Sequence, residues 1–343
     1  MFRFAKFQIP NHILVIIGIL LHSCQAEIPS RKYNGISLVA SRDSLEESQI
    51  DRILSVNANV VALMPYAFMG SPEQPELIFD VDRQWFGERA EGIEQAISIL
   101  QYRKLKIMIK PHIWIRNGQF TGNLNFSSEK DWLIFEESYR KYMLLYANIA
   151  EKHQIEMFCI GTELFNFTNE RPEFWKSLMR DVRKVFNGKI VYAENWDKVD
   201  KTEIWKETDY IGVDAYFPIH DAASPEKEEI REGWKEHKNM LQELSSKYHK
   251  PIIFTEYGYR NIDHSLKKPW KSDRNYSNIN NDLQARALEI IYEEFWNENW
   301  FSGGFLWKWH QYEKAGGTEN DRFTPQNKPA ENIVKEYYQK FRN

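Results

Sequence analysis

The sequence predicts a single α/β domain folded as a (β/α)8 barrel over residues 27–343. From residue 34 onward, eight short apolar or β-branched segments alternate with longer segments of helical periodicity. Several of the short segments are apolar on both faces, as parallel strands covered by helices are. No Pro-, Gly- or Ser-rich linker divides the chain. A doubly wound sheet is the alternative, but eight such units across roughly 310 residues fit a barrel better.

The expected elements follow from these two periodicities. Strands are expected where runs of Val, Ile, Leu and Phe are bounded by polar residues, namely at 35–40, 59–64, 106–113, 156–161, 189–193, 210–214, 251–255 and 304–309. Helices are expected at 44–56, 88–104, 129–153, 172–187, 225–249, 282–298 and 329–341, with a short, weaker helical piece at 198–207. Long loops rich in Pro, Gly, Asn and aromatic residues follow the second, third and seventh strands, as ligand-binding loops do.

Composition narrows the class of protein. Apolar residues make up 42% and charged residues 27%, so a large core is available and wholesale disorder is excluded. The net charge is −4 and no basic stripe is present, which argues against a nucleic-acid partner. Aromatic residues reach 15%, with 12 Trp, more than a core needs and suited to stacking on sugars.

The N-terminus has the features of an export signal covering residues 1–26. Two basic residues precede the apolar run 13–21, which is too short to span a bilayer as a helix. The sequence LHSC ending at Cys24 resembles a lipobox, and cleavage after Ala26 is the alternative. The expected location is therefore the periplasm, the cell surface as a lipoprotein, or the medium, with membrane contact only through a lipid anchor at Cys24.

Cysteine and histidine usage predicts a domain without disulfide, metal or cofactor. Cys24 and Cys159 are the two cysteines, and Cys159 lies in an apolar run where a small core residue is expected. The sequence has no CxxC or HExxH motif, and its 9 His are scattered. We expect a monomer.

Two glutamates are the strongest catalytic candidates. Reactive residues of a barrel lie at the C-terminal ends of its strands, and Glu163 and Glu256 follow the fourth and seventh expected strands, each after a Thr. Two carboxyl groups across a cleft suit glycosidic bond cleavage, with retention at a separation of roughly 5–5.5 Å and inversion at roughly 6.5–9.5 Å. A purely structural role, as a helix cap or ion-pair partner, is the alternative; it is the favoured interpretation for Asp214 and Glu194.

Other strand ends carry polar or aromatic residues that would line such a cleft. The candidates for substrate binding are Lys110, His112, Asn195, Trp196, Tyr216, Trp307 and Trp309. Trp114 and Trp270 lie in expected loops and could also stack on sugars.

Seven stretches in chain order carry a resemblance to a known family. They are KPHI (110–113), FCIGTEL (158–164), YAENWD (192–197), IGVDAYFPIH (211–220), FTEYGYR (254–260), GGFLWKWH (303–310) and FTPQNKPAENIV (323–334). Together they resemble the β-mannanases of glycoside hydrolase family 113, which belong to a clan of retaining (β/α)8 glycosidases. The resemblance implies metal-free cleavage of β-1,4-mannosidic bonds with retention, on a mannan or manno-oligosaccharide substrate.

The resemblance also implies roles for individual residues. Glu163 matches the acid/base, Glu256 the nucleophile, and Tyr216 a tyrosine that hydrogen-bonds the nucleophile. Trp307 matches the aromatic floor of the sugar site, with Trp309 as its rival. Lys110, His112, Asn195 and Trp196 match positions that line the subsite. The wider clan commonly has Asn before the acid/base where this chain and family 113 have Thr (Thr162), so the clan's contact to the sugar 2-hydroxyl is not transferred.

Three functional hypotheses follow. The first is a retaining endo-acting β-mannan hydrolase. The second is an exo-acting β-mannosidase, or a clan relative that cleaves another β-glycan; the size of the earliest products separates endo from exo action. The third is a non-catalytic glycan-binding surface lipoprotein, which would have no need of both Glu163 and Glu256.

Overall fold

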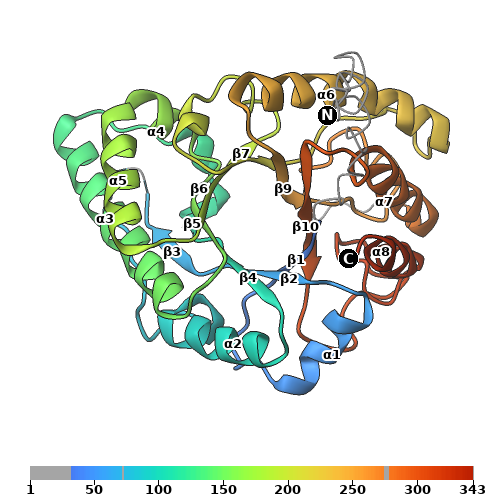
Figure 1. Cartoon of the computed structure of the whole chain (residues 1–343), viewed down its shortest axis with the longest axis horizontal. Helices are drawn as coiled ribbons and strands as arrows, with labels where there is room; N and C mark the ends of the chain where they lie inside the picture. Colours follow the sequence, from blue (N-terminus) through green and yellow to red (C-terminus); the bar gives the residue numbers. More distant parts are fainter. Residues whose placement is uncertain (1–31, 72, 274–277, 343) are drawn as a thin grey trace, which may run out of the picture. The chain divides into compact units, whose positions relative to one another are not determined.

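The structure, a computed structural model, describes residues 32–71, 73–273 and 278–342. Eight parallel strands form a closed barrel in the order β1-β2-β4-β6-β7-β8-β9-β10, with β10 pairing back onto β1 (Figure 1). The predicted (β/α)8 barrel is confirmed. The predicted export signal at 1–26, including Cys24, lies outside the described residues.

Each of the eight predicted strands is present in the barrel. The strands are β1 (Tyr33–Leu38), β2 (Val60–Leu63), β4 (Lys106–Ile109), β6 (Met157–Thr162), β7 (Lys189–Asn195), β8 (Tyr210–Asp214), β9 (Ile252–Tyr257) and β10 (Phe301–Trp309). Their C-terminal ends meet at one rim, because all neighbouring pairs are parallel. The loops that carry the candidate site therefore converge there.

The prediction of the third strand, at 106–113, is wrong at its C-terminal end. The barrel strand β4 stops at Ile109, and β5 (His112–Ile115) instead pairs with β3 (Tyr66–Met69) in a separate two-stranded parallel sheet. Pro111 has no N–H to continue the barrel ladder. The N–H of His112 donates instead to the carbonyl of Pro65 at 2.9 Å, so the chains after β2 and β4 leave the barrel together. The sequence did not predict β3.

Helices cover the outside of the barrel (Figure 1). They are α1 (Glu47–Ser55), α2 (Ala90–Tyr102), α3 (Glu129–Lys152), α4 (Phe165–Glu170), α5 (Pro172–Val185), α6 (Lys227–Tyr248), α7 (Asn281–Phe295) and α8 (Pro329–Lys340). The short α4 was not predicted, and the expected helix at 198–207 contains only the 3-10 turn Ile204–Lys206. Among the described residues, no helix is both long and apolar enough to cross a membrane.

Local signals explain where the helices begin. Pro172 and Pro329 occupy the first turns of α5 and α8, where the missing N–H has no intrahelical partner to lose. Ser128 caps α3 by accepting from the backbone N–H of Asp131, and Asn280 caps α7 in the same way.

The barrel interior is filled by side chains from alternating strand positions. It is formed by Val60, Ala62, Met108, Met157, Cys159, Val191, Ala193, Ile253 and Phe305. Phe305 fits because Gly35 faces it: a Cβ on Gly35 would lie 2.6 Å from a ring carbon of Phe305. Burying an aromatic side chain of this size stabilises the fold by roughly 1.5–3 kcal/mol. Cys159 is fully buried here as a free thiol.

Candidate active site

Glu256, at the end of β9, is held by donors on both carboxylate oxygens. The Lys110 ammonium donates to Oε1 at 2.5 Å, and the Tyr216 hydroxyl donates to Oε2 at 2.8 Å. The His112 ring nitrogen Nε2 lies 3.8 Å from Oε1. Glu256 is 6% exposed, so water contributes little to its solvation. The ammonium and the phenol stabilise a negative charge on Glu256 and fix its orientation.

Lys110 is shared between Glu256 and a second carboxylate. Its ammonium lies 3.1 Å from Oδ1 of Asp214, which also accepts from the Thr255 hydroxyl at 2.7 Å. Burial by itself would lower the pKa of Lys110, but the charges of Asp214 and Glu256 outweigh it and raise that pKa. Burial, followed by the charge of Glu256, raises the pKa of Asp214 to about 7. Lys110 is therefore a permanent cation that Asp214 positions against Glu256.

Glu163, directly after β6, has a different environment. It is half-buried, and no ion pair to Lys or Arg is formed by its carboxyl within the described part of the chain. Burial is the largest effect on Glu163, and the charges of Asp214 and Glu256 add to it, so its pKa lies well above the usual range. A raised pKa favours the protonated form of this carboxyl, which is the form that a general acid requires.

The backbone of Glu163 is in the left-handed region, with φ of 51°. Such a conformation costs a non-glycine residue about 1–3 kcal/mol and persists only where neighbours impose it. Here the Glu163 N–H donates to the carbonyl of Ala193 at 2.8 Å, and the Thr121 hydroxyl donates to the Glu163 carbonyl at 3.1 Å. The strained turn sets the direction in which the side chain leaves β6.

The two candidate tryptophans of β10 differ in exposure. Trp309 is 0% exposed and belongs to the core between barrel and helices, whereas Trp307 is half-buried. Trp307 stacks beside His112, with ring centroids 6.3 Å apart and an angle of 22° between the planes. Trp307 is thus the one of the pair whose ring lies beside His112 in the candidate site.

His112 has an unused ring nitrogen next to these groups. Burial, followed by the charge of Lys110, lowers the pKa of His112 well below its usual range, so the ring is neutral. Its Nε2 is buried, without a hydrogen-bond partner among the described residues. A buried polar atom in this position can bond a substrate hydroxyl without first losing a protein partner.

The remaining candidates lie at the end of β7. The side chain of Asn195 is engaged locally, donating to Asp197 at 3.0 Å and accepting from the N–H of Trp196 at 3.1 Å. Trp196 stacks on Trp270, with centroids 5.3 Å apart and an interplanar angle of 25°. Trp270 is 43% exposed, so this pair offers an aromatic surface to solvent.

Glu194 accepts hydrogen bonds from Thr202 at 2.6 Å and from the backbone of Asn195. It is completely buried. Burial outweighs these bonds and raises its pKa to about 7. Its contacts support the turn after β7 and give it no exposed surface for substrate.

Sequence reasoning missed the aromatic residues of the small sheet. The ring centroid of Tyr66 in β3 lies 5.3 Å from that of His112. The ring centroid of Phe68 lies 6.0 Å from that of the exposed Trp114 in β5. The signal was present, because Tyr66 and Phe68 alternate with apolar residues over Tyr66–Met69. No group of three or more His, Cys, Asp or Glu among the described residues is placed to hold a metal ion.

A family model supports an assignment. The model of glycoside hydrolase family 113 matches residues 40–328, most of the chain. The chain belongs to glycoside hydrolase family 113. The catalytic glutamates expected from the sequence both fall inside the matched region, and the protein is a family 113 glycoside hydrolase.

Solved structures of the same family are similar over nearly their whole length. A family 113 β-mannanase from Alicyclobacillus acidocaldarius, in complex with ManMIm, is 23% identical with a TM-score of 0.79, covering 90% of this chain and 98% of the other. A family 113 β-1,4-mannanase is 25% identical with a TM-score of 0.74, covering 90% and 99%. No curated protein matches the chain.

Proposed function

We propose that this family 113 glycoside hydrolase cleaves β-1,4-mannosidic bonds of mannan or manno-oligosaccharides with net retention. Glu163 is the acid/base and Glu256 the nucleophile. The contrast between the two carboxyl groups carries the proposal. Glu256 is charge-paired with Lys110 and bonded by Tyr216, whereas the pKa of Glu163 is raised. One carboxyl group held against a cation and one without such a partner are the nucleophile and acid/base pair that glycosidases need.

In the first step, Glu163 gives its proton to the departing glycosidic oxygen. A carboxylate oxygen of Glu256 attacks the anomeric carbon, the bond to the leaving oxygen breaks, and an ester forms between Glu256 and the sugar. The ester is neutral, so the Coulombic effect by which Glu256 raises the pKa of Glu163 disappears. The pKa of Glu163 therefore falls when the ester forms, which favours its action as a base in the next step.

In the second step, Glu163 takes a proton from a water molecule that attacks the anomeric carbon. The ester bond breaks and Glu256 leaves as a carboxylate, which Lys110 and Tyr216 stabilise again. Two displacements at the same carbon give net retention. The exposed aromatic rings Trp114 and Trp270 supply stacking surfaces beside the site for further sugar units of an oligosaccharide.

The mannan specificity is supported by the family 113 structures, which are described as β-mannanases. Export through residues 1–26, with or without a lipid on Cys24, is part of the same proposal, since a polysaccharide substrate is met outside the cell. Intact mass of the membrane fraction tests the lipid.

The direct test uses the protein from Glu27 onward with mannohexaose and with carboxymethyl-cellulose, sizing the products over time. We expect short manno-oligosaccharides from mannohexaose, and none from the matched Glu256→Ala protein. Oligomers as first products mean endo action, and mannose alone means exo action. Cleavage of the cellulose derivative in place of mannohexaose would refute the mannan specificity, and binding without cleavage would favour a glycan-binding protein.

A further inference from the structure

A cavity of about 760 Å³ is lined mainly by residues at the end of β10 and in the loop that follows it. Trp307 and Phe323 lie where it meets the catalytic residues: Trp307 stacks beside His112, and Phe323 lies edge-on to Tyr216 with centroids 6.1 Å apart. Two of its lining residues are therefore packed against residues that flank Glu256. A substituent on a sugar held at Trp307 would enter it.

The lining of this cavity carries basic side chains. Lys308, Lys314 and Arg322 line it, and its described lining residues include no Asp or Glu. The whole chain has more acids than bases, 49 against 45, so this gathering of cations departs from the composition. Arg322 is partly balanced, because it lies 3.2 Å from Asp321 and donates to the backbone carbonyls of Ser272 and Asp273.

Lys308 is the cation of this cavity that lies beside Trp307. Its ammonium lies 5.4 Å from the ring centroid of Trp307, and within the described part of the chain it forms no hydrogen bond or ion pair. Burial lowers its pKa, with the charge of Glu256 opposing that effect. A half-buried ammonium without a counter-ion is unfavourable, and a bound anion would remove that cost.

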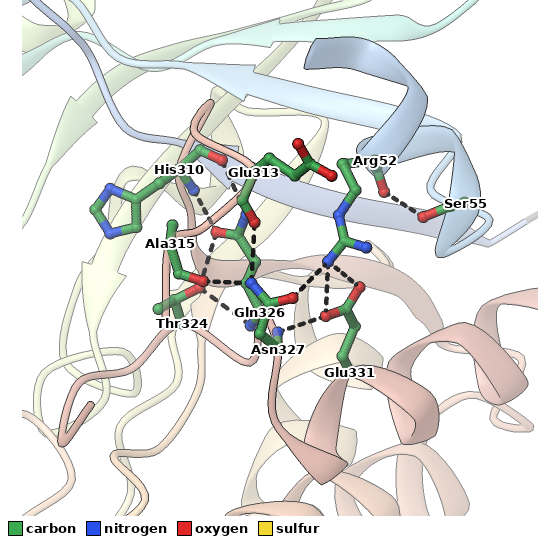
Figure 2. Close-up of polar contacts among 9 residues, drawn as sticks. All are labelled: Arg52, Ser55, His310, Glu313, Ala315, Thr324, Gln326, Asn327 and Glu331. Atoms are coloured by element: carbon green, nitrogen blue, oxygen red, sulfur yellow. Dashed lines mark hydrogen bonds and ion pairs between the residues drawn. The ribbon is translucent and has the colours of Figure 1, made fainter. Parts of the chain in front are cut away.

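Hydrogen bonds fix the loop on both sides of Lys314, and Figure 2 shows those made by Gln326 and Asn327. Gln326 binds both backbone groups of His310, accepting from its N–H at 2.7 Å and donating to its carbonyl at 3.0 Å. Asn327 donates to the carbonyls of Glu313 at 3.0 Å and Ala315 at 2.7 Å. These bonds hold both sides of Lys314, so the cavity is formed before any ligand arrives, which favours binding.

Asn327 also connects this loop to α8 and, through Glu331, to α1. The backbone N–H of Asn327 donates to Glu331 of α8 at 2.6 Å, and Glu331 pairs with Arg52 of α1 at 2.8 Å (Figure 2). The loop after β10 is thus fixed to two helices that cover the barrel.

We propose that this cavity binds an anionic substituent on a sugar of the substrate, a carboxylate or a sulfate or phosphate ester, with Lys308 as its counter-ion and Lys314 at its rim. A neutral mannan leaves Lys308 unpaired, so the preferred substrate is an acidic β-linked manno-oligosaccharide or a relative of it. The inference rests on the proposed function and deepens it, because it names the class of glycan.

Binding is measured by calorimetry on the Glu163→Gln protein, since Gln keeps the shape of the side chain but cannot protonate the leaving oxygen, which halts turnover. The probes are neutral manno-oligosaccharides, the same oligosaccharides oxidised at C6 to uronates, and their sulfated forms. We expect one acidic form to bind about tenfold more tightly than the neutral form, an advantage that falls as salt rises. Whichever acidic form binds identifies the carboxylate or the ester.

Lys308→Met should abolish the preference while neutral oligosaccharides still bind, and Lys314→Gln, an exposed and safer change, should reduce it. The matched control is Lys247→Met on α6, an exposed lysine whose ammonium lies 5.1 Å from the ring of Tyr248. Equal affinity for neutral and acidic probes, or a preference that survives Lys308→Met, would overturn the inference. Hydrolysis of neutral mannohexaose by the unmodified protein reports the proposed function separately.

Discussion

Lys110→Met removes the cation that Glu256 and Asp214 share, and its effect can be estimated from the structure. Charges 2.5 Å apart attract by about 7 kcal/mol at an effective dielectric constant of about 20, before desolvation is counted. Measured losses on breaking a buried pair are about 3–5 kcal/mol. We therefore expect Lys110→Met to lower the free energy of unfolding by about 3–5 kcal/mol, because it leaves two buried carboxylates without their cation.

The assay is urea unfolding at neutral pH. The matched control is Lys106→Met, on the same strand but at its other end, where Lys106 pairs with Glu156 at 2.6 Å and is partly exposed. That control should cost at most about 1 kcal/mol, as a solvent-exposed ion pair does. The double variant Lys110→Met/Asp214→Asn should regain part of the stability lost in Lys110→Met, since it removes one of the two uncompensated carboxylates. A Lys110→Met protein as stable as the Lys106→Met control would refute the role given to Lys110.

Three further predictions test the rest of the site. Tyr216→Phe removes the 2.8 Å hydrogen bond to Glu256, and a hydrogen bond to a charged group contributes about 1.5–3 kcal/mol. We therefore expect kcat/KM to fall about 10- to 100-fold in steady-state assays. An unchanged rate would mean that this bond does not strengthen in the transition state. Trp307→Ala should raise KM with little change in Tm, whereas Trp309→Ala should cost about 3–5 kcal/mol in urea unfolding, and the reverse pattern would exchange their roles. The pKa of Glu194 is raised to about 7, so the folded state holds its proton longer than the unfolded state and the contribution of Glu194 to stability falls as pH rises from about 4.5 to 7. Glu194→Gln should flatten the unfolding free energy across that range, and an equally steep dependence would show that other groups cause it.

The fold could be predicted because its periodicities are strong. Eight buried parallel strands leave runs that are apolar on both faces, and the helices between them keep the helical period. The predicted end of the third strand was wrong because a local run of apolar residues does not show which neighbouring strand it pairs with. Here Pro111 interrupts the barrel strand, and the His112 N–H donates a hydrogen bond to the carbonyl of Pro65 instead.

The candidate glutamates could be found from their positions after strands, but their environments could not. Lys110 reads as a strand-end residue that lines a cleft, while the structure buries it completely between Asp214 and Glu256. These three residues are far apart in the chain and meet only when the barrel closes. The left-handed backbone of Glu163 likewise depends on a carbonyl from the neighbouring strand.

The most direct test of the central claim is a mass-spectrometric search for the covalent intermediate with a 2-deoxy-2-fluoro-mannosyl fluoride. The fluorine at C2 slows both displacements, and the reactive leaving group lets the ester accumulate. We expect the intact protein to gain the mass of one fluorosugar and peptide mapping to place it on Glu256. Turnover of the probe without labelling, or a label on another residue, would contradict the assignment of Glu256 as the nucleophile.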